Sequence, residues 1–189
     1  MDRERLLACF EQVPVVAAAK SAEGLERALH SESGVIFLLF GDILSIGEMV
    51  ARVKAAGKIA IVHMDLIEGL AARDIGVDFL ADRTRADGII STTASLIRRA
   101  KQRGLVTIQR FFLLDSLVLE NIEKQVNSGA ADFLEVLPGL MPKIISHLSR
   151  TAGRPIIAGG LIRDKEDVVG ALKAGAVAIS STNDAVWFM

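Results

Sequence analysis

The sequence is poor in cysteine and in aromatic residues. A single cysteine, Cys9, excludes a disulfide within the chain, and three scattered histidines leave no cluster for a structural zinc ion. Tyrosine is absent and aromatic residues make up 5% of the chain, so we expect no aromatic platform that stacks nucleic-acid bases. A chain with so little cysteine fits the reducing cytoplasm.

Long apolar runs and a strong charge of either sign are also missing. No apolar stretch approaches the roughly 20 residues needed to span a bilayer. The first residues have mixed charges, unlike the basic and then long apolar regions of a signal peptide. The formal net charge of −1 gives no global attraction to nucleic acid or membrane, so such a partner would have to meet a local patch. We expect a cytoplasmic protein without a membrane partner.

What the chain does contain is a repeat of short runs rich in β-branched residues, with amphipathic segments between them. The eight runs lie at 15–19, 35–40, 59–65, 88–91, 106–111, 133–137, 156–158 and 177–180. Several segments between them end on a glycine shortly before the next run, as helices commonly do. The pattern predicts one α/β domain over residues 1–189, a compact (β/α)8 TIM-type barrel whose terminal helix is trimmed.

Two neighbouring polar turns stand out in the last third of the chain. Gly159 and Gly160 follow one apolar run, and Ser181 and Thr182 follow the next. Glycine lets an anion approach backbone N–H groups, and hydroxyls add further donors. Either turn alone also suits a plain strand-to-helix connection, but their occurrence on consecutive units favours a phosphate site. We therefore expect a phosphorylated small molecule as ligand.

Charged residues at the C-terminal ends of the predicted strands are further candidates, because these ends form the floor of a barrel's site. They are Lys20, Asp65, Arg110 and Glu135, with His63 on the same strand face as Asp65. Buried Glu135 needs a partner, which is either a ligand hydroxyl or an internal cation, Arg110 or Lys20. Asp65 either meets ligand hydroxyls or caps the following helix. His63 either lines the site wall beside Asp65 or is a packed barrel residue.

No catalytic constellation is legible around these residues. Lys20 and Lys58 are the only lysines at strand positions and both lie at strand ends, so no mid-strand Schiff-base lysine is offered. No Ser–His–Asp or Cys–His set assembles, and we expect neither a metal site nor a cofactor. Because many chemistries share barrels, an enzyme acting on a small triose-phosphate-like substrate stays open as an alternative.

Longer blocks of the sequence resemble one family. They lie at 63–70, 87–92, 107–116, 135–142, 155–162 and 180–183, with Trp187. Taken in this order over nearly the whole chain, they are similar to the glycerol uptake operon antiterminators. The resemblance implies a TIM-type barrel that binds glycerol 3-phosphate and, so liganded, acts on leader mRNA to prevent premature transcription termination. It therefore implies a regulator of glycerol utilisation genes rather than an enzyme.

The resemblance also implies roles for the candidate residues. Those expected to hold the phosphate are Gly159, Gly160, Ser181 and Thr182, and those expected to meet the glycerol hydroxyls are Asp65, Glu135, Lys20 and Arg110. RNA-contact candidates are the basic residues of one helix, Arg98, Arg99, Lys101 and Arg103, beside a second cluster at Arg150, Arg154, Arg163 and Lys165. Each basic cluster is either a phosphate-binding surface or an ordinary solvated face.

Overall fold

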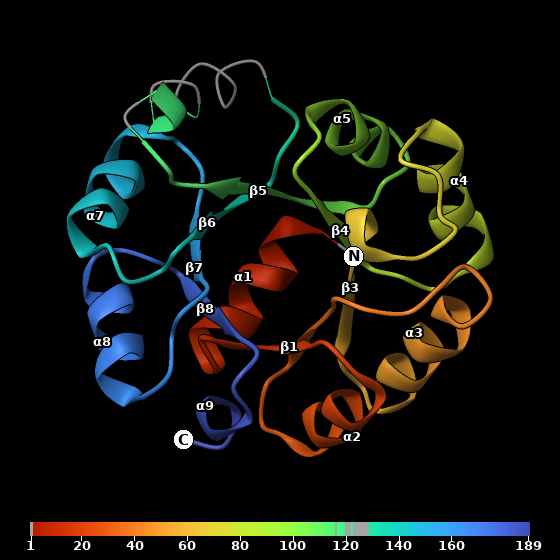
Figure 1. The fold of residues 1–189 in the computed structure, drawn as a ribbon, viewed down its shortest axis with the longest axis horizontal. Helices are drawn as coiled ribbons and strands as arrows, with labels where there is room; N and C mark the ends of the chain where they lie inside the picture. The colour runs from red at the N-terminus through yellow and green to blue at the C-terminus, as the bar shows by residue number, and fades with distance from the viewer. Residues whose placement is uncertain (1, 116, 120–121, 123–128) are drawn as a thin grey trace.

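The structure is a computed structural model that describes residues 2–115, 117–119, 122 and 129–189. Its strands form a closed parallel barrel in the sequential order β1 to β8, which confirms the predicted (β/α)8 fold (Figure 1). The strands are β1 (Val15–Ala19), β2 (Val35–Leu38), β3 (Ile59–His63), β4 (Gly88–Ser91), β5 (Val106–Phe112), β6 (Phe133–Leu137), β7 (Ile156–Gly159) and β8 (Ala178–Ser181).

Helices surround the barrel on its outer side (Figure 1). They include α2 (Ala22–His30), α3 (Ile46–Ala55), α4 (Asp74–Arg83), α5 (Ala94–Gln102), α7 (Pro142–Thr151), α8 (Lys165–Lys173) and α9 (Asp184–Trp187). The four-residue α9 agrees with the trimmed terminal helix expected from the sequence. Glycines with positive φ follow α3, α5, α7 and α8, as the repeated punctuation predicts. Within the described ranges, no helix is both long and apolar enough to cross a membrane.

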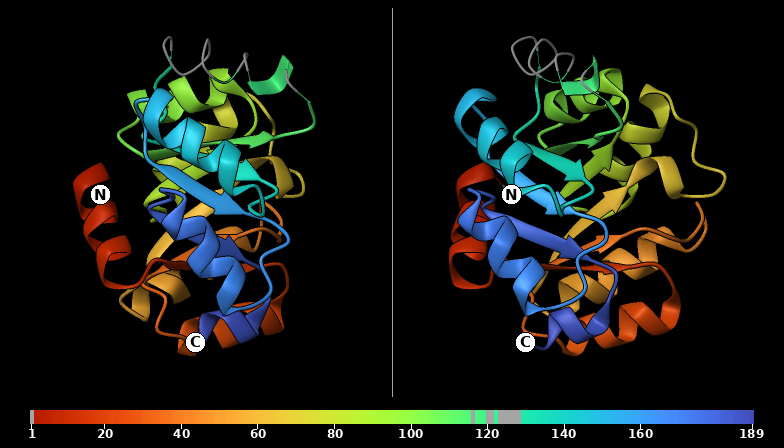
Figure 2. Two further views of the ribbon diagram at one scale, coloured as in Figure 1. Left: turned by 90° about the vertical axis from the view of Figure 1, so that its left-hand side faces the viewer. Right: turned by 60° about the vertical axis from the view of Figure 1, so that its left-hand side comes forward.

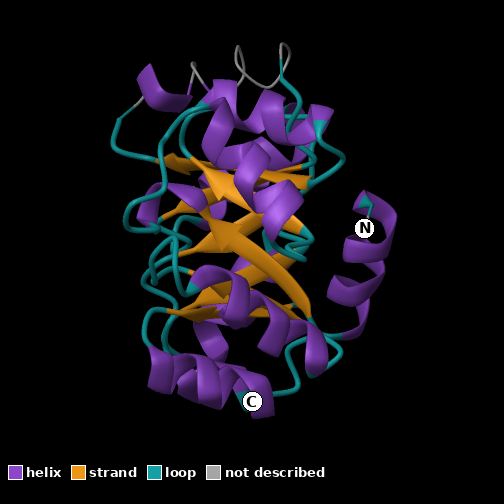
Figure 3. Ribbon diagram, turned by 90° about the vertical axis from the view of Figure 1, so that its right-hand side faces the viewer, coloured by secondary structure: helices purple, strands orange, loops and turns teal. Residues whose placement is uncertain are grey.

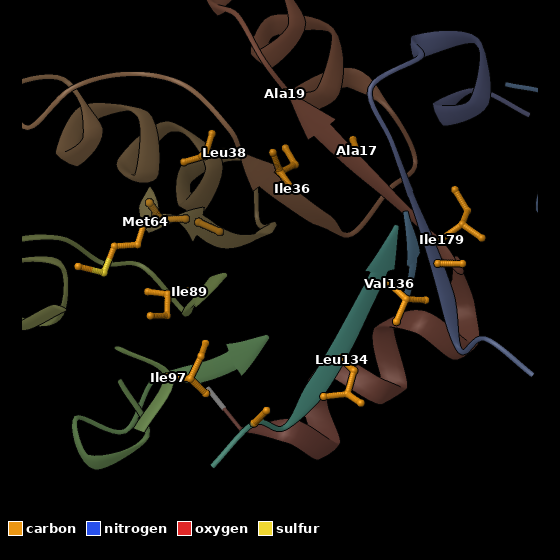
Figure 4. Close-up of a cluster of buried hydrophobic side chains, with 14 of the residues drawn as sticks. Ala17, Ala19, Ile36, Leu38, Met64, Ile89, Ile97, Leu134, Val136 and Ile179 are labelled. Carbon is orange, nitrogen blue, oxygen red and sulfur yellow. The ribbon is translucent and has the colours of Figure 1, made fainter. Parts of the chain in front are cut away.

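Alternation along the strands divides the apolar core into two layers. On β2, Val35 and Phe37 belong to the cluster inside the barrel, whereas Ile36 and Leu38 belong to the cluster between the barrel and its helices. Figure 4 shows part of this outer layer, in which strand side chains meet the helices. A parallel barrel needs both layers, because each strand is covered on both faces.

A helix that precedes the first strand closes one end of the barrel. In this helix, α1 (Arg3–Gln12), Leu6 and Phe10 are buried and belong to the interior cluster. The Phe10 ring meets Phe133 edge to face, with ring centroids 5.7 Å apart. In Figures 2 and 3 α1 lies against one end of the barrel, and the strand arrows in Figure 2 point away from it. The repeat of β/α units did not predict this helix, because it stands outside that repeat.

Two strands are shorter than the sequence pattern predicts. The run at 35–40 is a strand only to Leu38, and the run at 59–65 ends at His63 because the next residues form a 3-10 turn, η1 (Met64–Leu66). The turn ends the two-residue alternation at His63, so alternation no longer sets the direction of the Asp65 side chain. That these two side chains line one wall stays a prediction.

Truncation of the Phe10 side chain, by which α1 closes the end of the barrel, is expected to destabilise the protein. The variant Phe10→Ala opens a cavity among the interior residues and should lower the free energy of unfolding by about 3–5 kcal/mol. Phe188→Ala is the matched control, because Phe188 is 55% exposed and its truncation should change stability by less than about 0.5 kcal/mol. Urea denaturation measures the free energy of unfolding of both variants. Equal losses would contradict the role of α1 in closing the barrel.

Candidate functional site

A pocket of about 400 Å³ lies at the barrel end opposite α1. It is lined by Ala18, Leu39, Arg110, Glu135, Leu137, Gly160, Leu161, Ile162, Arg163, Ser180, Ser181, Thr182 and Asn183. Most of these residues lie at the C-terminal ends of β5 to β8 or in the two loops that follow β7 and β8. This is the end of a TIM barrel at which ligands bind, and the loops after the seventh and eighth strands are its common phosphate site.

A buried ion pair forms the floor of the pocket. Arg110 and Glu135 are register partners on β5 and β6, and Arg110 Nε donates to Glu135 Oε2 at 2.6 Å. Ser180 Oγ donates to the other oxygen, Oε1, at 2.5 Å. Each carboxylate oxygen therefore has a donor, which a fully buried carboxylate requires. Of the partners left open by the sequence, the structure pairs Glu135 with Arg110.

Gly159 makes space for this carboxylate. A Cβ atom at position 159 would lie 2.6 Å from Ser180 Oγ and 2.8 Å from Glu135 Oε1, closer than side-chain carbons approach. Gly159 is buried behind the ion pair and is not among the pocket-lining residues, whereas Gly160 is. The two glycines therefore differ in position: Gly159 packs against the Glu135 carboxylate, and Gly160 lines the pocket.

The β7–α8 loop presents backbone N–H groups at the pocket. Gly160 and Leu161 have φ of +74° and +63°, a left-handed conformation that is strained for leucine. Leu161 and Ile162 lie outside helices and strands, and among the described residues their N–H groups have no protein acceptor. Successive N–H groups around left-handed residues form concavities that bind anions.

The two hydroxyl residues at the end of β8 have different roles. Ser181 Oγ donates to the carbonyl oxygen of Ile162 at 2.9 Å and accepts from the N–H of Asn183, so its side chain joins the loops that follow β7 and β8. Trp187 Nε1 fixes the same residue from α9 by donating to the Ser181 carbonyl at 2.7 Å. Thr182 is exposed and lines the pocket.

Arg163 lies in the pocket lining, whereas the sequence pattern groups it with the second basic cluster. It forms no ion pair within the described residues. Because Arg110 is neutralised by Glu135, Arg163 supplies the unpaired positive charge of the pocket. Its position three residues after Gly160, in the loop itself, was the available signal.

Lys20 and Asp65 lie outside the pocket lining. Lys20 follows β1 and is exposed. Asp65 accepts hydrogen bonds from Ser91 Oγ at 2.7 Å and from the N–H of Thr92 at 2.8 Å, so it joins the loops after β3 and β4. It does not cap α4, whose N-cap residue is Arg73.

His63 is a buried polar residue near the floor. It is 3% exposed, and within the described ranges its Nδ1 has no hydrogen-bond partner. Burial, followed by the nearby charge of Arg110, lowers the pKa of His63 to about 4, while Asp65 acts in the opposite direction. The imidazole is therefore neutral near pH 7. In the described part of the chain, no three His, Cys, Asp or Glu side chains gather as metal ligands would.

Comparison with known proteins decides the family. A family model described as the glycerol-3-phosphate responsive antiterminator matches residues 15–187. The chain belongs to this antiterminator family. The resemblance seen in the sequence blocks is thereby confirmed. The chain is also 43% identical over 182 residues to YgcP of Escherichia coli (strain K12), described as uncharacterized, with 96% of this chain and 95% of YgcP covered.

Two solved structures agree with the antiterminator assignment. The glycerol uptake operon antiterminator regulatory protein of Listeria monocytogenes has a TM-score of 0.89 and 31% identity, with 93% of this chain and 95% of that chain covered. A glycerol uptake operon antiterminator-related protein of Thermotoga maritima has a TM-score of 0.81 and 31% identity, with coverages of 93% and 98%. The barrel described above is thus the fold of this family.

The four predicted RNA-contact residues lie on or next to α5, and most of them are already paired. The ion pairs join Arg99 to Asp78, Arg103 to Asp82 and Asp78, and Lys101 to Asp132. Arg99 holds Asp78 through two nitrogens at 2.9 and 2.8 Å, which lowers the pKa of Asp78 and raises that of Arg99. Arg98 is exposed and has no ion pair among the described residues.

Breaking the floor ion pair should destabilise the antiterminator barrel strongly. Arg110→Met leaves the Glu135 carboxylate buried without its cation, and the free energy of unfolding should fall by about 3–5 kcal/mol. The double variant Arg110→Met with Glu135→Gln removes the stranded charge and should recover most of the loss. Chemical denaturation of both proteins measures the difference. If the double variant is as unstable as the single one, the loss comes from packing instead.

The buried His63 predicts a pH dependence of stability. The unfolded chain protonates His63 near pH 6.5 and the folded chain near pH 4, so the stability due to the neutral form is complete above pH 6.5. It falls as the pH drops from 6.5 through 4, by about 3 kcal/mol in total. Relative to His63→Gln, the wild-type protein should lose this stability in urea denaturation over that pH range. Parallel stability curves for the two proteins would contradict the prediction.

Proposed function

We propose that this chain is a cytoplasmic, glycerol-3-phosphate-responsive RNA-binding antiterminator that controls genes of glycerol uptake and utilisation. One observation carries the proposal: a pocket at the C-terminal end of an antiterminator-family barrel combines an arginine and backbone N–H groups that have no partner among the described residues. This combination suits a small phosphate ester. The volume of about 400 Å³ is in the range of small-molecule sites.

The two ends of the effector are assigned to different parts of the pocket. The phosphate accepts hydrogen bonds from the loop at Gly160–Ile162, from Thr182 and from Arg163. The glycerol hydroxyls face the floor, where Glu135 and Arg110 lie. A carboxylate oxygen with one donor keeps a second lone pair, so Glu135 still accepts a hydroxyl proton while paired. Gly159 and Ser181 support this arrangement from behind.

The floor favours a sensor over a catalyst. Arg110 and Ser180 each donate a hydrogen bond to one oxygen of Glu135, so the carboxylate is held in place by the floor of the pocket. His63, with its pKa lowered to about 4, is a weak base at neutral pH. The family description is likewise regulatory. Binding without turnover is what an effector site requires.

The effector and the leader RNA must then be thermodynamically linked. Glycerol 3-phosphate should raise the affinity for the leader transcript of a glycerol utilisation operon, and the transcript should raise the affinity for glycerol 3-phosphate by the same factor. Calorimetry with the ligand and fluorescence anisotropy with the RNA measure the two factors. The ligand should be recovered chemically unchanged after long incubation, and turnover would support the enzyme alternative.

Two substitutions at one position test the phosphate assignment. Gly160→Asp introduces a negative charge into the pocket and should weaken glycerol 3-phosphate binding about 100-fold, a change of roughly 3 kcal/mol. Gly160→Asn has nearly the same shape and is tolerated in the left-handed conformation, so it is the matched neutral control and should bind far better than the aspartate variant. Calorimetry measures both affinities. Equal affinities in folded variants would place the phosphate elsewhere.

A further inference from the structure

Resting on the proposed function, we infer that the phosphates of the leader RNA bind in the groove between α7 and α8. We also infer that the β7–α8 loop links this groove to the effector pocket. The two helices lie side by side on the outside of the barrel (Figures 1 and 2). The groove is an open depression of about 530 Å³, lined by Pro142, Lys143, Ser146, Arg150, Gly170, Lys173 and Ala174.

The charge of the groove is of one sign. Three of its lining residues are cations, Lys143, Arg150 and Lys173, and no lining residue is acidic. All three are exposed, and none forms an ion pair with another described residue. Cations without carboxylate partners are free to replace the counterions of a nucleic-acid backbone, which is the main source of such binding energy. The overall net charge of −1 hides this local excess.

Two of the three cations lie along α7, and the third lies across the groove on α8. Lys143 and Arg150 are seven residues apart, so they lie on one face of α7 about 10 Å apart along its axis. Arg150 Nη1 donates to Ser146 Oγ at 2.6 Å, which holds the guanidinium over the groove. Lys173, in the last turn of α8, faces the same groove from the other side. A polynucleotide strand that follows α7 would meet Lys143 and Arg150 on the α7 wall and Lys173 on the α8 wall.

The floor of the groove suits a backbone rather than stacked bases. Its α8 side is formed by Gly170 and Ala174, and a Cβ atom on Gly170 would meet nothing within 4 Å. No aromatic side chain lines it, so the contacts are phosphate contacts that position the RNA. The adjoining cleft toward the start of α8 is lined by Glu166 and Asp167, which confine phosphates to the C-terminal half of that helix.

The predicted surface on α5 offers less free charge. Arg99, Arg103 and Lys101 are each held by an aspartate, and RNA would have to compete with those carboxylates for them. Only Arg98 of that set is unpaired among the described residues. The α7–α8 groove has three unpaired cations where α5 has one, so it is the better site for phosphates.

The same helix connects the groove to the effector pocket. The loop that lines the pocket ends at Arg163, whose N–H donates to Asp167 Oδ2 at 2.9 Å, and Asp164 caps α8 by accepting from the N–H of Asp167 at 3.0 Å. An effector that fixes this loop therefore also fixes the first turn of α8, the helix whose C-terminal half forms one wall of the groove. RNA affinity then responds to the effector without direct contact between the two ligands.

The test compares two triple variants that change the net charge equally. The groove variant carries Lys143→Gln, Arg150→Gln and Lys173→Gln. The control carries Arg83→Gln, Arg85→Gln and Arg98→Gln, all exposed cations on the α4–α5 side. Anisotropy titrations with the leader transcript over a range of salt concentrations give the affinity and its salt slope. Calorimetry with glycerol 3-phosphate shows that each variant keeps its fold and effector site.

The groove variant should bind the effector as the wild-type protein does, yet lose at least tenfold in RNA affinity at low salt. Its salt slope should fall by about 2, because each phosphate contact on single-stranded RNA contributes roughly 0.7. The control should keep both quantities. If the groove variant keeps them, or both variants lose equally, the groove assignment is overturned and the proposed function stands. If the wild-type protein binds no leader RNA with or without effector, the proposed function itself fails.

Discussion

A carboxylate buried at the mouth of a barrel must have donors on both oxygens, and the candidate site is arranged around this requirement. Glu135 receives one bond from Arg110 on the neighbouring strand and one from Ser180 two strands away. Gly159, on β7 between the strands of Glu135 and Ser180, lacks the side chain that would collide with these two residues. Because the ion pair is neutral as a unit, the net charge of the pocket falls to Arg163 in the loop above it. The site can therefore attract an anion although its floor contains a buried acid.

The polar floor depends in turn on how the rest of the barrel is filled. Leu6 and Phe10 of α1 close the opposite end, and apolar side chains such as Phe37 and Phe133 fill the interior beneath the ion pair. The pocket therefore lies above an interior filled by apolar side chains. The apolar interior also explains why His63 is neutral. His63 is the last residue of β3, and its burial disfavours the charged form of the imidazole.

The parts of the structure that repeat along the sequence could be predicted from it, and the parts that depend on one contact could not. Eight β-branched runs with glycines after the helices are enough to indicate the barrel. Strand alternation allows only one of Gln109 and Arg110 to face the lumen, and the structure places Arg110 in the pocket lining. Helix α1 has no counterpart in the repeat. The turn η1, in which Asp65 accepts a hydrogen bond from Ser91, is a local change of backbone conformation. Apolar periodicity does not predict such a change. The role of Gly159 depends on the carboxylate of Glu135, a contact between residues far apart in sequence.

The sign of the proposed coupling says something about its cause. Glycerol 3-phosphate is an anion, so its charge alone would oppose the binding of a second polyanion. However, Arg163 precedes the N-terminal end of α8, and the two ends of this helix, Lys165 and Lys173, are already about 12 Å apart along its axis, more than the screening length of roughly 8 Å at physiological salt. Direct repulsion between the two ligands is then weak, and an increase in RNA affinity must come from ordering the loop and the helix that both sites share. In this view the strained backbone at Leu161 is the point where effector binding is converted into a fixed wall of the groove.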